Sequence, residues 1–268
     1  MIDAALTSGV HAAMREACSR AILPRWQTLA AHEITAKTAD DAVTVADHES
    51  EAILFERLAA LLPEAALVGE EAAHADPALL DRLANGLCWI VDPLDGTNNF
   101  AQAKPPFGVL VALSDGGDTL AGWILDGLSG RFCHAVRGQG AFIDGQPIAA
   151  RPSGLEPPIA AISLIFMDPE RRAAVQRHIA PHYALVDIPR CAAEQYPRLV
   201  LGQNDGSIFE RTLPWDHAAG VLFLNEAGGR AARMDGSPYK VGEWDRPGLI
   251  GAASPALWDA LAERMAKL

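Results

Sequence analysis

An apolar segment that runs directly into two carboxylates constrains this chain more than any other feature. Residues 89–100 read WIVDPLDGTNNF, so a hydrophobic run ends at Asp92, and Asp95 follows three residues later. Pro93 has a fixed φ and no N–H, which makes the link between the two acids stiff. Gly96 allows the backbone to approach a ligand closely because it has no Cβ. The pattern predicts a buried strand whose acidic end can hold a divalent cation through oxygen ligands.

Two further acidic segments could complete such a site. Gly69-Glu70-Glu71 precedes the strand, and the sequence WDHAAG at 215–220 lies far downstream. If a helix begins after Gly96, the amides of Gly96 and Thr97 would favour an anion with help from the helix dipole. The pentapeptide DPLDG alone is also typical of a solvated turn. The three segments together favour a site for metal and phosphate.

These segments resemble the motifs of the inositol monophosphatase family, which are lithium-sensitive, Mg²⁺-dependent phosphomonoesterases. The family pattern reads G-E-E, then W-x-x-D-P-[ILV]-D-G-T-x-N-F, then W-D-x-A-A-G, and this chain has all three in that order. The resemblance covers essentially the whole chain. It implies an α/β fold layered as an αβαβα sandwich, two or three Mg²⁺ ions per site and a homodimer. It also implies hydrolysis by metal-activated water without a phospho-enzyme.

The resemblance assigns roles to individual residues. It implies metal ligation by Glu70, Asp92, the Leu94 carbonyl, Asp95 and Asp216. It implies catalytic roles for Glu70, which orients the attacking water, for Thr97, which hydrogen-bonds that water, and for Asp47, which pairs with the threonine. It implies substrate contacts by Asp95, Gly96, Thr97, Ala193, Glu210 and Asp216. Asp47 also suits a helix N-cap ahead of an amphipathic run, and both roles can hold together.

The segment before the last motif departs from the family. It reads Arg190-Cys191-Ala192-Ala193 where many relatives show G-[ST]-A-A, and the link from Glu210 to Asp216 is one residue shorter than in some relatives. These changes fall where the leaving group would bind, which is where specificity is set. Arg190 or Arg211 could bind a second phosphate, or both could be surface arginines paired with acids.

The expected substrate is therefore a small phosphorylated polyol or sugar such as inositol 1-phosphate. The alternatives are a 3′(2′),5′-bisphosphate nucleotidase, a fructose-1,6-bisphosphatase and a histidinol-phosphatase. A regulatory protein that uses the same fold to bind a partner is a further alternative, because some bacterial relatives are implicated in transcription and RNA processing.

Composition limits the binding partners and the cellular compartment that we expect for this protein. The 268 residues carry a formal net charge of −12, which argues against nucleic-acid or anionic-membrane surfaces. The four cysteines show no C-x-x-C spacing, which fits a reducing cytosol, and no signal peptide is evident at the N-terminus. We expect a cytoplasmic protein. Cys191 is expected to be a small buried residue, and His48 and His217 are expected to face outward or cap helices.

Periodicity and turn residues predict the order of elements. Helices are expected over residues 1–30 with a break near Pro24, and over 48–62, 77–85, 169–179, 191–202, 215–227 and 254–267. Strands are expected over 66–68, 87–91, 108–114, 119–126, 130–136, 159–165, 183–188, 206–210 and 248–252, with a hairpin-like region around residues 235–236. The Pro-, Gly- and Ser-rich stretch 151–158 predicts a boundary between an N-terminal half, 1–150, and a C-terminal half, 151–268, that carries the WDHAAG motif.

Overall fold

The computed structural model describes residues 2–38 and 41–268. Within them, three sheets form, and two of these have more than two strands. The larger of these two carries the segment 89–95, and its strands lie in the order β3-β4-β5-β6-β7-β8-β9. The bounds are β3 Ala66–Gly69, β4 Leu87–Asp95, β5 Gly108–Asp115, β6 Asp118–Asp126, β7 Phe132–Val136, β8 Ala141–Ile143 and β9 Gln146–Ile148. Neighbouring strands are antiparallel except β3 and β4, which are parallel.

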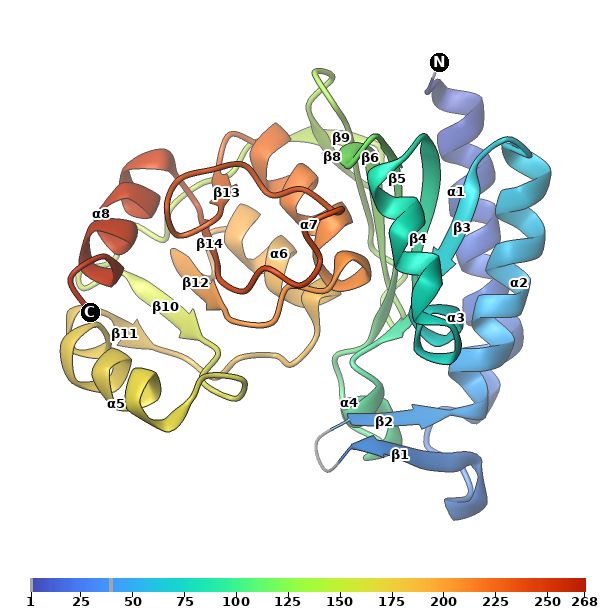
Figure 1. Cartoon of the computed structure of the whole chain (residues 1–268), viewed down its shortest axis with the longest axis horizontal. Coiled ribbons are helices and arrows are strands. Elements are labelled where there is room, and N and C mark those ends of the chain that lie inside the picture. Colours follow the sequence, from blue (N-terminus) through green and yellow to red (C-terminus); the bar gives the residue numbers. More distant parts are fainter. Residues whose placement is uncertain (1, 39–40) are drawn as a thin grey trace.

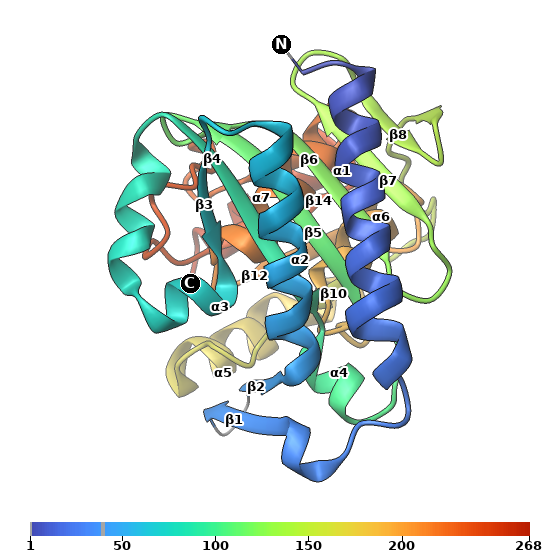
Figure 2. The ribbon, with the colours of Figure 1, turned by 90° about the vertical axis from the view of Figure 1, so that its right-hand side faces the viewer.

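Helices cover both faces of this sheet, as Figure 1 shows. Helices α1 (Ala4–Ala17) and α2 (Val45–Leu61) pack on one face, and α6 (Ala192–Val200) and α7 (Pro214–Glu226) pack on the other. Figure 2 looks onto the α1 and α2 side. Because both faces are covered, β4 is apolar at successive positions rather than at alternate ones. That burial explains the continuous hydrophobic run that precedes Asp92.

The second sheet lies beyond α6 and α7 and has the order β11-β10-β12-β14-β13 among the described residues. Its strands are β10 Ile159–Ile162, β11 Ala184–Leu185, β12 Gly206–Phe209, β13 Arg230–Ala232 and β14 Leu249–Ala252. Helices α5 (Pro169–His178) and α8 (Pro255–Met265) cover its outer face (Figure 1). The layers alternate helix, sheet, helix, sheet, helix, which confirms the αβαβα sandwich.

Several local expectations need correction. A two-stranded hairpin, β1 (Ile34–Thr38) with β2 (Asp41–Thr44), precedes α2 and was not predicted. Strands β8 and β9 were also missed, and the strand expected over 183–188 contains only two residues. The helix expected over 77–85 is a 3₁₀ helix, Pro77–Ala84. The helical region expected over residues 1–30 instead ends near Pro24: α1 continues as a π-helical turn, Cys18–Ile22, and a 3₁₀ turn, Leu23–Arg25, and no helix follows over residues 26–30.

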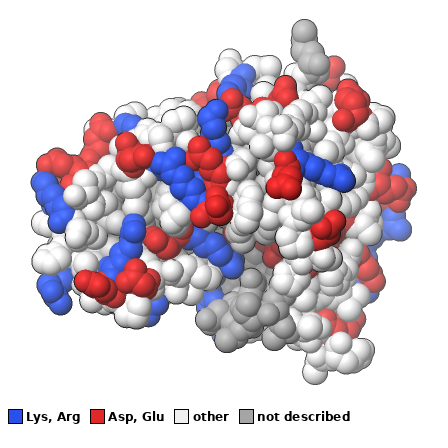
Figure 3. All heavy atoms as spheres, viewed as in Figure 1, with Lys and Arg blue, Asp and Glu red and all other residues white. Residues whose placement is uncertain are grey.

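Segment 151–158 contains no helix or strand, but the division of the chain at this point stays a prediction. On the face drawn in Figure 3, Lys and Arg side chains are interspersed with Asp and Glu. In the described part of the chain, none of the helices combines the length and the apolar character needed to cross a bilayer.

Candidate active site

A bulge at the end of β4 brings Asp92 and Asp95 to the same pocket. Side chains of a regular strand alternate between the two faces, so residues three positions apart would point in opposite directions. Here Asp92 pairs with Leu110 and Asp95 pairs with Gly108, so β4 advances one residue more than β5 between these points. The extra residue reverses the alternation, as β-bulges do. Pro93 lies in this bulge, where its missing N–H costs no ladder hydrogen bond.

Glu70 reaches this place through the parallel pairing of β3 with β4. Gly69 is opposite Val91, so Glu70 follows β3 where Asp92 continues β4. Glu70 opens the short helix α3, Glu70–Ala75, whose first turn is held by a side chain from α2. The Glu51 carboxylate accepts hydrogen bonds from the amides of Glu71 and Ala72, both at 3.0 Å. This contact anchors the beginning of α3 against α2.

Asp216 comes from the opposite side, in the first turn of α7. Two glycines allow α7 to approach its neighbours closely. A Cβ on Gly122 of β6 would lie 2.6 Å from the Cα of Ala219, and a Cβ on Gly220 would overlap the Tyr196 ring of α6. The Ala-Ala-Gly part of the WDHAAG motif is therefore a packing surface, and this surface sets the position of Asp216 relative to the sheet.

The buried carboxylates repel one another electrostatically. Burial raises the pKa of Asp92 well above its usual value, and the negative charges of Glu70, Asp95 and Asp216 raise it further. Burial raises the pKa of Asp95 to about 6, although a hydrogen bond from the Ala193 amide to Asp95 Oδ2, at 2.6 Å, opposes that shift. A divalent cation among these groups would offset both the burial that raises the pKa values of Asp92 and Asp95 and the repulsion that adds to the shift of Asp92.

Thr97 and Asp47 lie in contact. The Thr97 hydroxyl is 2.9 Å from Asp47 Oδ1 and 2.8 Å from the Leu94 carbonyl oxygen, so its single proton can be donated to either acceptor. Asp47 is not the N-cap of α2, because Thr44 holds that position. Asp47 accepts from the Thr44 amide at 2.8 Å, which completes a capping box. Burial raises the pKa of Asp47 to about 7.

Gly96 adopts a left-handed conformation, with φ +83°, immediately before the short helix α4, Thr97–Ala101. A Cβ on Gly96 would also lie 2.9 Å from the Pro106 carbonyl oxygen, so glycine is required for both conformation and space. Because α4 has only five residues, its dipole is small, and an anion here would depend on the individual amides.

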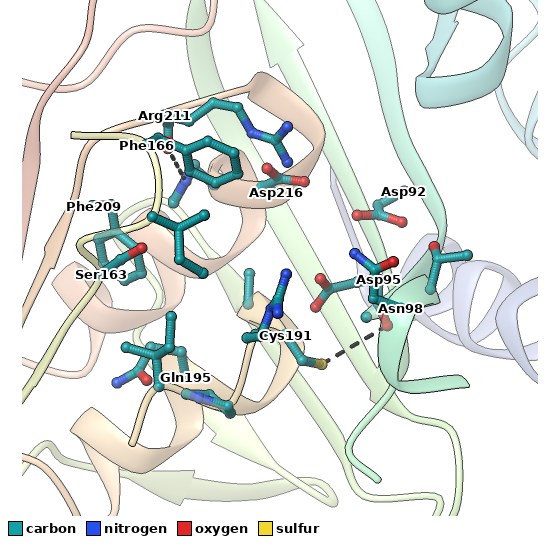
Figure 4. Close-up of a pocket in the computed structure, with 18 of the residues that line it drawn as sticks. Asp92, Asp95, Asn98, Ser163, Phe166, Cys191, Gln195, Phe209, Arg211 and Asp216 are labelled. Atoms are coloured by element: carbon teal, nitrogen blue, oxygen red, sulfur yellow. Dashed lines mark hydrogen bonds between the residues drawn. The ribbon is translucent and has the colours of Figure 1, made fainter. Parts of the chain in front are cut away.

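One pocket collects most of the predicted site residues. It is lined by Glu70, Asp92, Leu94, Asp95, Gly96, Thr97, Glu210 and Asp216, together with Phe166, Arg190, Cys191, Gln195 and Arg211. Figure 4 shows the carboxylates of Asp92, Asp95 and Asp216 facing the same space from opposite sides. Among residues 2–38 and 41–268, no three or more His, Cys, Asp or Glu side chains already form a metal-binding group. The donor set of carboxylates and one carbonyl nevertheless fits Mg²⁺.

Two predicted substrate residues have contacts that the sequence did not indicate. Ala193 is buried and is not part of the pocket lining, and its amide supports Asp95 instead. Glu210 lines the pocket, but its carboxylate is 3.5 Å from the Arg171 guanidinium. Both roles assigned to these residues therefore stay predictions.

His217 does not face outward, and that expectation was wrong. It is 3% exposed, with Nδ1 at 2.7 Å from the Tyr196 hydroxyl and Nε2 at 3.1 Å from the Arg211 carbonyl. These partners assign the proton to Nε2, and burial lowers the pKa of His217 to about 3. The expectation failed because α7 is covered on all sides. His48 is exposed as expected, and Cys191 is buried, with its thiol pKa raised by burial.

Sequence reasoning also missed Asn99, Phe166 and Gln195. The Asn99 side chain donates to the carbonyls of Pro106 at 2.8 Å and Pro189 at 2.9 Å, which ties α4 to the segment before α6. Phe166 and Gln195 also line the pocket, and Figure 4 shows Phe166 beside Arg211. The second asparagine of the D-G-T-N-N-F segment was a signal that could have indicated the first of these contacts.

The layered α/β fold and the acidic pocket at the end of β4 are the features by which this protein can be compared with known families. Residues 4–268 match the sequence profile of the inositol monophosphatase family, and the chain belongs to that family. An inositol-1-monophosphatase of Bacillus subtilis is 31% identical over 209 residues, which cover 76% of this chain and 77% of that protein. The family and such relatives indicate a phosphatase.

Two other matches are a protein named as a Nus factor and a solved structure with a bound ligand. The Nus factor SuhB of Vibrio cholerae is 28% identical and covers 83% of this chain and 82% of that protein. The crystal structure of SaIMPase-II from Staphylococcus aureus with inositol monophosphate bound superposes with a TM-score of 0.76 at 21% identity. That match covers 97% of this chain and 94% of the other, and it shows the shared fold.

Proposed function

We propose that this protein is a Mg²⁺-dependent phosphomonoesterase that hydrolyses a small phosphorylated polyol or sugar resembling inositol 1-phosphate. The observation that supports the proposal is the convergence of Glu70, Asp92, Asp95 and Asp216 on one pocket beside the Thr97–Asp47 hydrogen bond. When bound, Mg²⁺ would supply a Lewis acid and lower the pKa of a water. Because the pocket holds several carboxylates, a phosphate dianion would be repelled without such cations.

The protein's own groups would position the reactants. Glu70, Asp92, the Leu94 carbonyl, Asp95 and Asp216 would hold two or three cations. The Thr97 hydroxyl would orient the attacking water, and Asp47 would fix that hydroxyl from the far side. The amides of Gly96 and Thr97 would hold the ester phosphate, since Gly96 leaves the backbone accessible. Phosphoryl transfer through a loose transition state depends mainly on such positioning and electrostatic stabilisation.

The substrate is proposed from the family and from the names of two similar proteins. SaIMPase-II binds inositol monophosphate, and the B. subtilis relative is an inositol-1-monophosphatase. The leaving group would lie toward Glu210 and Phe166, on the side of the pocket opposite β4. Bisphosphate nucleotidase, fructose-1,6-bisphosphatase and histidinol-phosphatase activities differ only in what occupies this side.

A panel of phosphate esters with Mg²⁺ tests this proposal. Inositol 1-phosphate, fructose 1,6-bisphosphate, adenosine 3′,5′-bisphosphate and histidinol phosphate should separate the four activities by kcat/KM. Turnover should disappear with excess chelator and return with Mg²⁺. The exposed Asp81, which lies outside the pocket, gives the matched control Asp81→Asn for the site variant Asp92→Asn. Release of phosphate from none of the esters would refute the proposal.

A regulatory role is the second candidate, and the relatives named Nus factor SuhB support it. Such a role needs a partner surface rather than an intact metal site. Asp92→Asn therefore separates the two functions, since a regulatory protein would retain its partner while losing turnover. On the face in Figure 3, the described basic side chains are interspersed with acidic ones, which disfavours direct RNA contact there.

A further inference from the structure

Arg190 lies in a part of the pocket wall whose backbone is held by hydrogen bonds on both sides. It lines the pocket and precedes Cys191, the N-cap of α6. The residue before it is held by Asn99, whose side chain donates to the Pro189 carbonyl at 2.9 Å. Three residues after it, the Ala193 amide donates to Asp95 at 2.6 Å. The backbone on both sides of Arg190 is therefore tied to the strand-end motif that carries the acidic site.

The backbone of Arg190 has the conformation of a glycine. Its φ is +52°, and among the described pocket-lining residues it is the one non-glycine residue with positive φ. Many relatives have glycine here, at the first position of G-[ST]-A-A. A residue with a Cβ is strained in this region, and strained positions cluster at functional sites, although Gln27, Ala103 and Asp144 also have positive φ outside this pocket. The arginine at this position therefore indicates that its side chain has a role in the pocket.

The charge of Arg190 is not neutralised within the described structure. Its guanidinium forms no ion pair with any residue in 2–38 or 41–268 whose side chain is described. Arg171, by contrast, faces Glu210 at 3.5 Å, and Arg211 stacks over the Phe166 ring at 4.2 Å. Arg190 is therefore available to a ligand. A guanidinium offers paired donors that suit phosphate oxygens.

We propose that Arg190 is a specificity-determining residue that binds a second phosphate on the leaving group. The preferred substrate would then be a sugar or polyol bisphosphate, with one phosphate at the acidic end of the pocket and the other at Arg190. This inference rests on the proposed phosphomonoesterase activity. It separates this chain from relatives with glycine at this position, which lack the guanidinium.

Three esters with the same sugar test the proposal. Glucose 1-phosphate, glucose 1,6-bisphosphate and glucuronic acid 1-phosphate carry a hydroxyl, a phosphate or a carboxylate at position 6. The kcat/KM for release of the 1-phosphate should be about 10-fold or more higher for the bisphosphate than for glucose 1-phosphate, the scale of one charge-assisted bidentate contact. This ratio should fall with added salt. A higher kcat/KM for glucuronic acid 1-phosphate than for glucose 1,6-bisphosphate would overturn the inference that Arg190 binds a second phosphate.

Variants identify the group that is responsible. Arg190→Gly removes the guanidinium and relieves the positive φ, and Arg190→Gln removes only the charge. Both should bring the bisphosphate-to-monophosphate ratio close to one, whereas Arg177→Gln, on the exposed side of α5, should leave the ratio unchanged. An unchanged ratio in both Arg190 variants, with glucose 1-phosphate still hydrolysed, would overturn this inference alone. Failure to hydrolyse any of the three esters would overturn this inference, and it would overturn the proposed function as well only if inositol 1-phosphate also released no phosphate.

Discussion

Gly122→Ala should damage the site without changing any residue in it. The new Cβ would lie 2.6 Å from Ala219 Cα and 2.9 Å from the Ala219 carbonyl oxygen, and both are backbone atoms that cannot rotate away. Ordinary contact begins at 3.4 Å, so α7 and β6 must separate by about 0.8 Å. Overpacking of this kind costs about 1–3 kcal/mol of unfolding free energy.

The same displacement should reach Asp216. It lies less than one helical turn from Ala219, so a shift of α7 moves its carboxylate away from Asp92 and Asp95 on the opposite wall. A misplacement near 1 Å can cost about 10²-fold in rate, so Mg²⁺-dependent kcat should fall by roughly that factor. Urea denaturation and steady-state kinetics on the best ester from the panel measure the two effects.

Gly206→Ala provides the matched control. Gly206 is also a strand glycine, but the nearest atom to its added Cβ is a methyl of the Leu261 side chain at 3.3 Å, which can move. We expect less than about 1 kcal/mol of destabilisation and little change in turnover. If Gly122→Ala matched the wild type in both stability and kcat, the close approach of α7 to β6 would not be what positions Asp216.

Three other perturbations probe the acidic pocket. Asp92→Asn should abolish Mg²⁺-dependent turnover but keep or raise the thermal midpoint, because Asp92 is buried among like charges; normal activity would remove it from the metal site. Thr97→Val should lower kcat by about 10²-fold, whereas Thr97→Ser keeps the hydroxyl and most of the rate; equal rates in all three proteins would exclude a role for that hydroxyl. Millimolar Li⁺ should inhibit turnover, as in the family, and indifference to Li⁺ would indicate a different metal geometry.

Strands β4 to β7 of the larger sheet were predictable because their signals are local and strong. The segments that became these strands are apolar runs, and short glycine-containing turns separate β5 from β6 and β6 from β7. The shorter strands were harder. Strand β11 has two residues and β8 three, so pairing with a neighbour, rather than intrinsic preference, makes them strands.

The acidic residues of the pocket were also predictable, but the roles of their neighbours were not. The motifs identified Glu70, Asp92, Asp95 and Asp216, and one pocket brings them together. No local pattern indicated that His217 would be buried against Tyr196, or that Ala193 would donate to Asp95. Those contacts depend on how α6 packs against both α7 and the larger sheet.

The sequence alone determined the chemistry at the end of β4: two carboxylates, a proline between them that stiffens the link, and a glycine that leaves the backbone open. Covalent structure and local sterics suffice for these features. The tertiary structure decided that both carboxylates share a face, through the bulge against β5, and that Glu70 and Asp216 join them. It also decided that Arg190 occupies a glycine-like conformation at the pocket wall. These arrangements arise from packing between distant segments, which no single stretch of sequence encodes.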